Sequence, residues 1–164
     1  MHETLKGERL ISCYEVYVNR KNNNEICCYV SFGDLVNGHP NIVHGGITAL
    51  VLDNTFGWLF VASKLPLAVT ANININYRAP IYANTSILIK AKIDGIENRK
   101  IKMSANIFDE KGTLLVEATS LFVTIKMPWY LKSALQVVTY LGAWMPGGGW
   151  LVGALVRRIG DVKN

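Results

Sequence analysis

Residues 44–63 read HGGITALVLDNTFGWLFVAS, and from Gly46 onward they form a run of apolar and small residues with a single charged side chain, that of Asp53. The run is too long for a strand and carries Ala, Leu and Gly at helical spacing, so it predicts a buried central helix over residues 46–63. An unpartnered carboxylate in such surroundings is costly, and unusual acids concentrate at functional sites. Asp53 is therefore the first candidate catalytic residue.

The residues directly before this helix indicate what the acid works with. His44 precedes two glycines, Gly45 and Gly46, which would allow a ligand to approach the backbone closely. The free N–H groups at the start of the helix would point at a polar atom bound there. A general base about two turns inside such a helix is typical of a hydrolase.

The segments around the helix are typical of β-strands. Residues 10–19 and 25–32 are rich in β-branched and aromatic residues and are separated by a polar turn, which indicates a hairpin. Residues 33–44 form a loop dense in Gly, Asn and Pro. Four further strands are predicted over residues 68–77, 86–96, 100–108 and 114–125.

This order predicts an α+β fold in which a curled antiparallel sheet wraps one apolar helix and buries it on nearly all sides. A transmembrane span is the alternative for residues 46–63, because their length is marginal for a bilayer. Asp53 and the sheet that follows argue against a span, since the apolar face of that sheet needs a cover.

The composition fits one domain that can bury a core without disulfides or metal. Of the 164 residues, 50% are hydrophobic and 18% charged, which suggests extra burial in an oligomer, a lipid-binding channel or a membrane surface. The net charge of +5 does not support nucleic-acid binding without a clustered basic surface. The histidines form no cluster at metal-ligand spacing and no P-loop is present, so neither metal nor cofactor is expected.

Cysteine use and the first residues of the chain bear on its compartment. Cys13, Cys27 and Cys28 match neither a CxxC pair nor a zinc site, so they are interpreted as small hydrophobes in an intracellular reducing compartment. Side chains of the adjacent Cys27 and Cys28 would face opposite sides of a strand. Residues 1–10 resemble neither a secretory signal nor a transit peptide. Mitochondrial and cytoplasmic locations both stay open.

The character of the chain changes at residue 127, which divides it into a domain over residues 1–126 and a hydrophobic tail over residues 127–164. No charged residue lies between Lys132 and Arg157, and three of the four tryptophans fall in the tail. Tryptophans at the ends of an uncharged stretch are an interfacial membrane signature. We predict a helical tail that contacts a membrane. A helix pair docked on the domain or at a subunit interface is the alternative.

Three stretches resemble the hotdog-fold thioesterase superfamily, and more closely the phenylacetate-pathway and THEM4-like acyl-CoA thioesterases. They are VHGGITALVLDNTFG (residues 43–57), VTANININYRAP (69–80) and LVEATSLFVTI (115–125). The resemblance covers residues 10–126. It implies a hotdog fold and hydrolysis of an acyl-CoA, of medium or long chain, to free acid and CoA. It also implies a homodimer or tetramer with each active site between two protomers.

The resemblance also implies roles for individual residues. The Gly46 N–H would polarise the thioester carbonyl, Asp53 would act as general base or nucleophile, and His44 would hold the loop or the carbonyl. Thr70 would position the water and would come from the partner subunit. Gly45 would lie against the substrate, and Asn54 would either orient the substrate or only cap a contact.

Three cations are candidates for binding the phosphates of coenzyme A, namely Arg78, Arg99 and Lys100, although cations at strand ends usually face water. Two other functions stay open. His39 and Asp53 resemble the loop histidine and helix acid of hotdog dehydratases, which act on hydroxyacyl thioesters. The uncharged tail would also suit a non-catalytic, membrane-associated acyl-binding protein.

Overall fold

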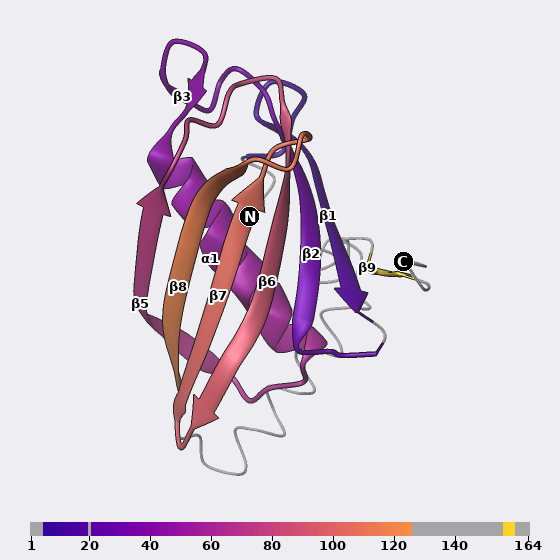
Figure 1. Ribbon diagram of the computed structural model, residues 1–164, viewed down its shortest axis with the longest axis vertical. Coiled ribbons are helices and arrows are strands. Elements are labelled where there is room, and N and C mark those ends of the chain that lie inside the picture. The colour runs from indigo at the N-terminus through magenta and orange to yellow at the C-terminus, as the bar shows by residue number, and fades with distance from the viewer. Residues whose placement is uncertain (1–4, 20, 126–155, 160–164) are drawn as a thin grey trace.

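The computed structural model describes residues 5–19, 21–125 and 156–159, which form a curled sheet with one helix against it (Figure 1). The main sheet has seven strands in the order β5-β8-β7-β6-β2-β1-β9, and β3 and β4 form a separate pair. The elements are β1 (Ile11–Asn19), β2 (Glu25–Phe32), β3 (Asn37–His39), β4 (Ile42–Val43), α1 (Gly45–Ala62), β5 (Ala68–Tyr77), β6 (Ser86–Glu97), β7 (Lys100–Phe108), β8 (Leu114–Thr124) and β9 (Val156–Ile159).

This architecture confirms the predicted hotdog fold, with the two strands, the helix and the four later strands where the sequence placed them. The short β3–β4 hairpin lies inside the segment that was predicted as a loop. Strand β9 pairs in parallel with β1, so the predicted helix is wrong for these four residues. The rest of the predicted tail, residues 127–155 and 160–164, lies outside the described residues, and the division at residue 126 stays a prediction.

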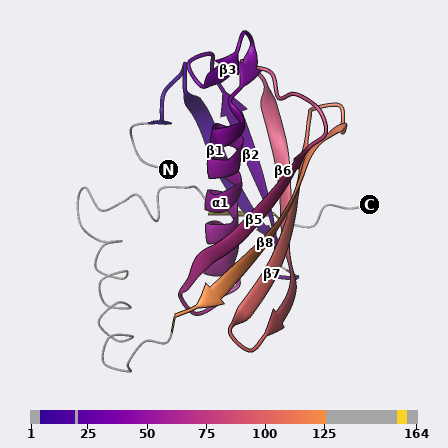
Figure 2. The same ribbon diagram turned by 90° about the vertical axis from the view of Figure 1, so that its left-hand side faces the viewer.

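The core lies between α1 and the concave face of the sheet (Figure 2). One side of the helix is buried against the strands, and Phe56 and Phe60 pack edge-to-face on Phe122 of β8 with ring centroids 6.0 and 4.9 Å apart. The buried helix residues are Thr48, Val51, Leu52, Thr55, Phe56 and Leu59. These contacts fix the rotation of α1 about its axis, and therefore fix which side chains face away from the sheet.

The opposite side of α1 is not covered by the other described elements. Leu50 and Val61 are 39% and 60% exposed, Gly46 and Gly57 are exposed, and Asp53 between them is half-buried. These residues are three or four positions apart and therefore share one helix face, which we call the open stripe. The prediction that the helix is buried on nearly all sides is wrong for one chain, and Asp53 is not enclosed by hydrocarbon.

Strand β5 forms the edge of the sheet beside α1, and most of its residues are exposed. Its alternation follows the sequence pattern, because Ile73 and Ile75 are half-buried while the asparagines on either side of each are exposed. Among the described residues, α1 is also the one helix long and apolar enough to cross a membrane by length and composition. In this structure, however, one side of α1 is buried against the sheet in the core of the domain.

The cysteines on β2 confirm the predicted alternation. Cys28 is buried under α1 and Cys27 is half-buried on the other side of the strand. Burial raises the pKa of the Cys28 thiol to about 12, so this cysteine acts as a small core residue. Cys13, Cys27 and Cys28 are all free thiols.

Candidate active site

His44 caps the N-terminus of α1. Its backbone is extended, and its Nδ1 accepts a hydrogen bond from the Gly46 N–H at 2.9 Å. The His44 carbonyl accepts from the N–H groups of Ile47 and Thr48 at 2.9 and 3.2 Å. A ring nitrogen that accepts a hydrogen bond carries no proton. The predicted oxyanion donor is therefore present at the start of the helix, but its hydrogen is engaged by the imidazole of the preceding cap.

Asp53 lies seven residues beyond Gly46 on the same face of α1, about 10 Å along the helix axis. Thr70 of β5 donates a hydrogen bond from Oγ1 to Asp53 Oδ1 at 2.9 Å. Both residues belong to one chain, so Thr70 reaches the carboxylate without a partner, in contrast to the expected contribution from another subunit. No lysine, arginine or histidine in the described part of the chain forms an ion pair with Asp53.

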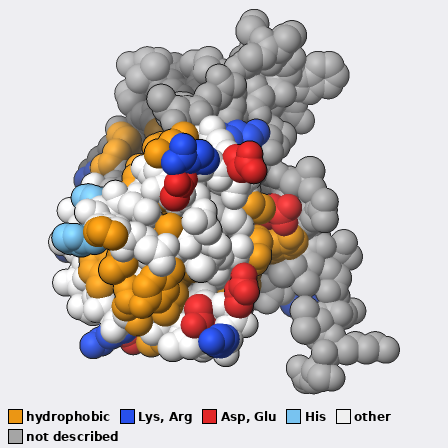
Figure 3. All heavy atoms as spheres, turned by 90° about the horizontal axis from the view of Figure 1, so that it is seen from above, with side chains coloured by type: hydrophobic (Ala, Val, Ile, Leu, Met, Phe, Trp, Pro, Cys, Tyr) orange, Lys and Arg blue, Asp and Glu red, His pale blue; other side chains and the backbone are white. Residues whose placement is uncertain are grey.

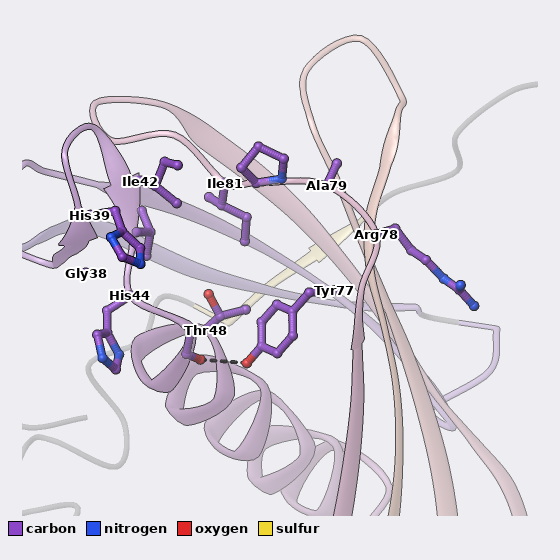
Figure 4. Close-up of a pocket in the computed structure, with 12 residues that line it drawn as sticks. Gly38, His39, Ile42, His44, Thr48, Tyr77, Arg78, Ala79 and Ile81 are labelled. Carbon is purple, nitrogen blue, oxygen red and sulfur yellow. Dashed lines mark hydrogen bonds between the residues drawn. The ribbon is translucent and has the colours of Figure 1, made fainter.

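A cavity of about 500 Å³ lies at the N-terminal end of the helix (Figure 4). Its walls are the β3–β4 hairpin, the first residues of α1, and residues 77–81 at and beyond the end of β5. They include His39, His44 and Gly45. This volume is typical of a small-molecule site. Hydrophobic side chains gather next to the histidines on this end of the molecule (Figure 3). Asp53 and Thr70 lie outside the lining, Asp53 farther along the open stripe and Thr70 on the neighbouring strand β5.

Tyr77 joins the cavity to the helix. Its hydroxyl donates to the Gly45 carbonyl at 2.8 Å, and its ring lines the cavity (Figure 4). Burial raises the pKa of the Tyr77 phenol. The sequence prediction contained Tyr77 only as the last residue of the strand over residues 68–77. Its place after Ile73 and Ile75 at the end of that strand was the signal that it faces the helix.

The three candidate phosphate ligands are not brought together in one chain. Arg78 lies at the cavity, but it pairs with Glu117 at 2.6 Å and points away from the cavity (Figure 4). Arg99 donates to the Thr124 carbonyl at the far end of β8, and the neighbouring Lys100 is exposed at the start of β7. The Leu115 carbonyl accepts a hydrogen bond from the Arg78 N–H. Leu115 and Thr124 are nine residues apart on β8, which corresponds to about 30 Å along a strand. Arg78 and Arg99 therefore contact opposite ends of β8.

The remaining predicted residues occupy different surroundings. Asn54 is half-buried and lies next to Tyr14, whose pKa is raised mainly by burial. Tyr14 hydrogen-bonds Thr55 at 2.8 Å, so Asn54 belongs to a polar cluster beneath the helix. His39 lines the cavity and Asp53 does not, so the dehydratase pair is not assembled within the chain. Among the described residues, no group of three or more potential metal ligands occurs.

Known proteins match the domain that carries this site. Residues 40–116 match the model of the thioesterase superfamily. Acyl-coenzyme A thioesterase THEM4 of Bos taurus is 35% identical over 113 residues, which cover 66% of this chain and 46% of THEM4. FMP10 of Saccharomyces cerevisiae is named as an uncharacterized mitochondrial membrane protein. It is 27% identical over 111 residues, which cover 65% of this chain and 45% of FMP10.

The structure matches hotdog proteins as well. The E. coli PaaI protein from the phenylacetic acid degradation operon superposes with a TM-score of 0.58 at 15% identity, covering 63% of this chain and 74% of PaaI. That likeness concerns the fold alone. The chain spans about half the length of the THEM4 proteins it matches. The hotdog fold, the HGG helix start and these matches agree with one another, and the thioesterase superfamily is the family whose model matches residues 40–116 of this chain.

Proposed function

We propose that this protein hydrolyses the thioester of an acyl-CoA, with Asp53 as general base or nucleophile. The contact that supports this proposal most directly is the Thr70–Asp53 hydrogen bond of 2.9 Å, on the same helix face as the Gly46 N–H. The similarity to THEM4 supports the same activity.

The chemistry needs few groups. Water adds to the thioester carbon, a tetrahedral oxyanion forms, and the C–S bond then breaks to release the thiolate of CoA. The oxyanion needs a fixed donor and the water needs a base, while the thiolate leaves without a strong acid. In the proposed reaction a Gly46 N–H exchanges its His44 acceptor for the oxyanion, and an Asp53 takes the proton from water. Because these two groups lie about 10 Å apart along one helix, they come from different protomers. Thr70 holds the carboxylate oriented.

The proposed enzyme is a homodimer or a tetramer built from such dimers, with the substrate held between two protomers. Leu50 and Val61 expose apolar surface on both sides of Asp53, and the edge strand β5 next to them has an open hydrogen-bonding side. Exposed apolar patches and open edge strands are features that association covers. An apolar cover over Asp53 favours a substrate with a medium or long acyl chain.

An activity panel tests the proposal. Purified full-length protein is assayed with acyl-CoAs from two to eighteen carbons by loss of thioester absorbance, with Asp53→Asn as the matched control. We expect hydrolysis by the wild type and a loss of about 100-fold or more in kcat for the control, as for removal of a general base. Folded wild-type protein that hydrolyses no member of the panel contradicts the proposal.

We also propose that the protein associates with a membrane. The uncharged, tryptophan-rich tail supports this, as does the similarity to a protein named as a mitochondrial membrane protein. Liposome flotation of full-length protein tests it, with a chain ending at Lys126 as the control. We expect only the full-length protein to float. Equal partitioning of both chains contradicts a role for the tail.

A further inference from the structure

Tyr77 and His44 hold the two ends of one peptide group. The Gly45 carbonyl accepts from the Tyr77 hydroxyl at 2.8 Å, and the Gly46 N–H donates to His44 Nδ1 at 2.9 Å. This carbonyl and this N–H belong to the same peptide bond. Because a peptide unit is planar and trans, the direction of the carbonyl fixes the direction of the N–H.

The peptide needs this restraint because both of its residues are glycines. Glycine has the widest backbone freedom of any residue, so the two glycines that give a ligand room also weaken the first turn of α1 that holds this peptide. His44 can restrain the N–H only while it accepts that hydrogen bond. Once a substrate oxygen replaces the imidazole, Tyr77 is the side chain that still holds the peptide.

The strand gives Tyr77 a firm base. Tyr77 is the last residue of β5 and pairs with Val116 of β8, and the next two N–H groups both donate to the Leu115 carbonyl at 2.8 and 3.0 Å. The contact with the helix is tight, since a Cβ added at Gly45 would lie 3.3 Å from the tyrosine oxygen. The sheet therefore sets the position of the hydroxyl, and the hydroxyl sets the position of the helix start.

We propose that Tyr77 is a positioning residue for thioester hydrolysis, acting through the Gly45–Gly46 peptide on the N–H that receives the oxyanion. This inference rests on the proposed function. A donor on the carbonyl also polarises the peptide and strengthens the hydrogen bond that its N–H gives, because linked hydrogen bonds reinforce one another. The effect grows with the charge on the acceptor, so it is larger for the oxyanion than for the thioester carbonyl.

Tyr77→Phe tests this role because it removes one oxygen and keeps the ring in the cavity wall. Tyr82→Phe is the matched control, since Tyr82 is 50% exposed against 52% for Tyr77 and lies outside the cavity lining. We expect kcat of Tyr77→Phe to fall about 10-fold, less than the 100-fold or more typical of losing a direct oxyanion donor. We expect KM to change less than twofold and Tyr82→Phe to match the wild type.

A second readout does not depend on activity. In ¹⁵N-glycine-labelled protein, the Gly46 amide proton should move upfield in Tyr77→Phe, because its peptide loses the polarising donor, while Tyr82→Phe leaves it in place. If Tyr77→Phe does not fold, Gly45→Ala displaces the hydroxyl without removing it and should lower kcat and move the Gly46 amide proton upfield. Unchanged kcat in the folded variant, or a lower melting temperature alone, overturns the positioning role.

The two proposals fail in different ways. An active wild type, an inactive Asp53→Asn variant and a fully active Tyr77→Phe variant would remove the role of Tyr77 and leave the thioesterase proposal standing. A wild type as inactive as Asp53→Asn would remove the thioesterase proposal, and the positioning role would fall with it. In that case the Gly46 amide shift would still report whether the tyrosine polarises the peptide.

Discussion

Replacing His44 by alanine should destabilise the start of α1, because it removes the acceptor of the Gly46 N–H and leaves the rest of the cap in place. That N–H lies 2.9 Å from His44 Nδ1. Losing an N-cap side chain costs about 0.5–2 kcal/mol. The first turn of this helix also contains two glycines, each about 1 kcal/mol less favourable than alanine in a helix, so the turn depends strongly on its cap.

We therefore expect His44→Ala to lower the free energy of unfolding by about 1–2 kcal/mol. For a chain of this size the melting temperature should fall by roughly 3–6 °C. Circular dichroism at 222 nm follows the transition at pH 7.5, with protein concentration held fixed because an oligomer would make the midpoint concentration-dependent. His44→Asn is the control, since asparagine is among the best N-cap residues.

The asparagine variant should keep most of the wild-type stability. If His44→Ala and His44→Asn lose the same amount, the imidazole stabilises the loop by packing, and its hydrogen bond to Gly46 contributes nothing measurable. If neither variant changes the midpoint, water replaces the cap at no cost, and the reasoning from cap geometry is refuted.

Three further perturbations follow from the described contacts. Thr70→Val should lower kcat about 10-fold, because it removes a hydrogen bond to the charged Asp53 carboxylate, while Thr70→Ser retains activity; equal kcat in all three proteins contradicts this. The pKa of Asp109 is lowered, chiefly by its hydrogen bond from the backbone N–H of Thr113, so its stabilising contribution is present above pH 3.8 and is lost as the pH falls below that value. The melting temperature of Asp109→Ala should thus lie below the wild type at pH 6 and approach it at pH 3, and a constant difference would refute the linkage. Cys28, whose thiol pKa is raised to about 12 by burial, should react with a thiol reagent at pH 8 only after unfolding, as followed by mass spectrometry.

The elements with long, regular patterns could be predicted from the sequence. Strand β5 alternates isoleucine and asparagine, which is typical of a strand. The apolar run of α1 is too long for a strand. Both elements were therefore predicted correctly. The β3–β4 hairpin was missed because strands of three and two residues are too short to show alternation. Strand β9 was missed because it belongs to a hydrophobic segment whose composition is typical of a helix.

The site was only partly predictable, for a physical reason. The identity of Asp53 follows from its isolation in an apolar run, but its exposure depends on which side of α1 the sheet covers. The contact with Thr70 depends on the register between β5 and β8, which contains an irregularity between Thr70 and Asn72. Local sequence does not encode such long-range geometry, and for the same reason the Tyr77 hydroxyl could not be matched to the Gly45 carbonyl.

The two acceptors that compete for the Gly46 N–H explain how a resting cap is compatible with the proposed reaction. A thioester carbonyl oxygen is a weaker hydrogen-bond acceptor than an imidazole nitrogen, so exchanging the imidazole for the carbonyl gains nothing in the ground state. An oxyanion is stronger, since hydrogen bonds to charged groups contribute about 1.5–3 kcal/mol against 0.5–1.5 kcal/mol for neutral ones. The exchange with His44 is then favourable only when charge develops on the oxygen. An interaction that strengthens only in the transition state raises kcat, so in this scheme the histidine cap suppresses ground-state binding at the helix start while Tyr77 keeps the peptide aligned.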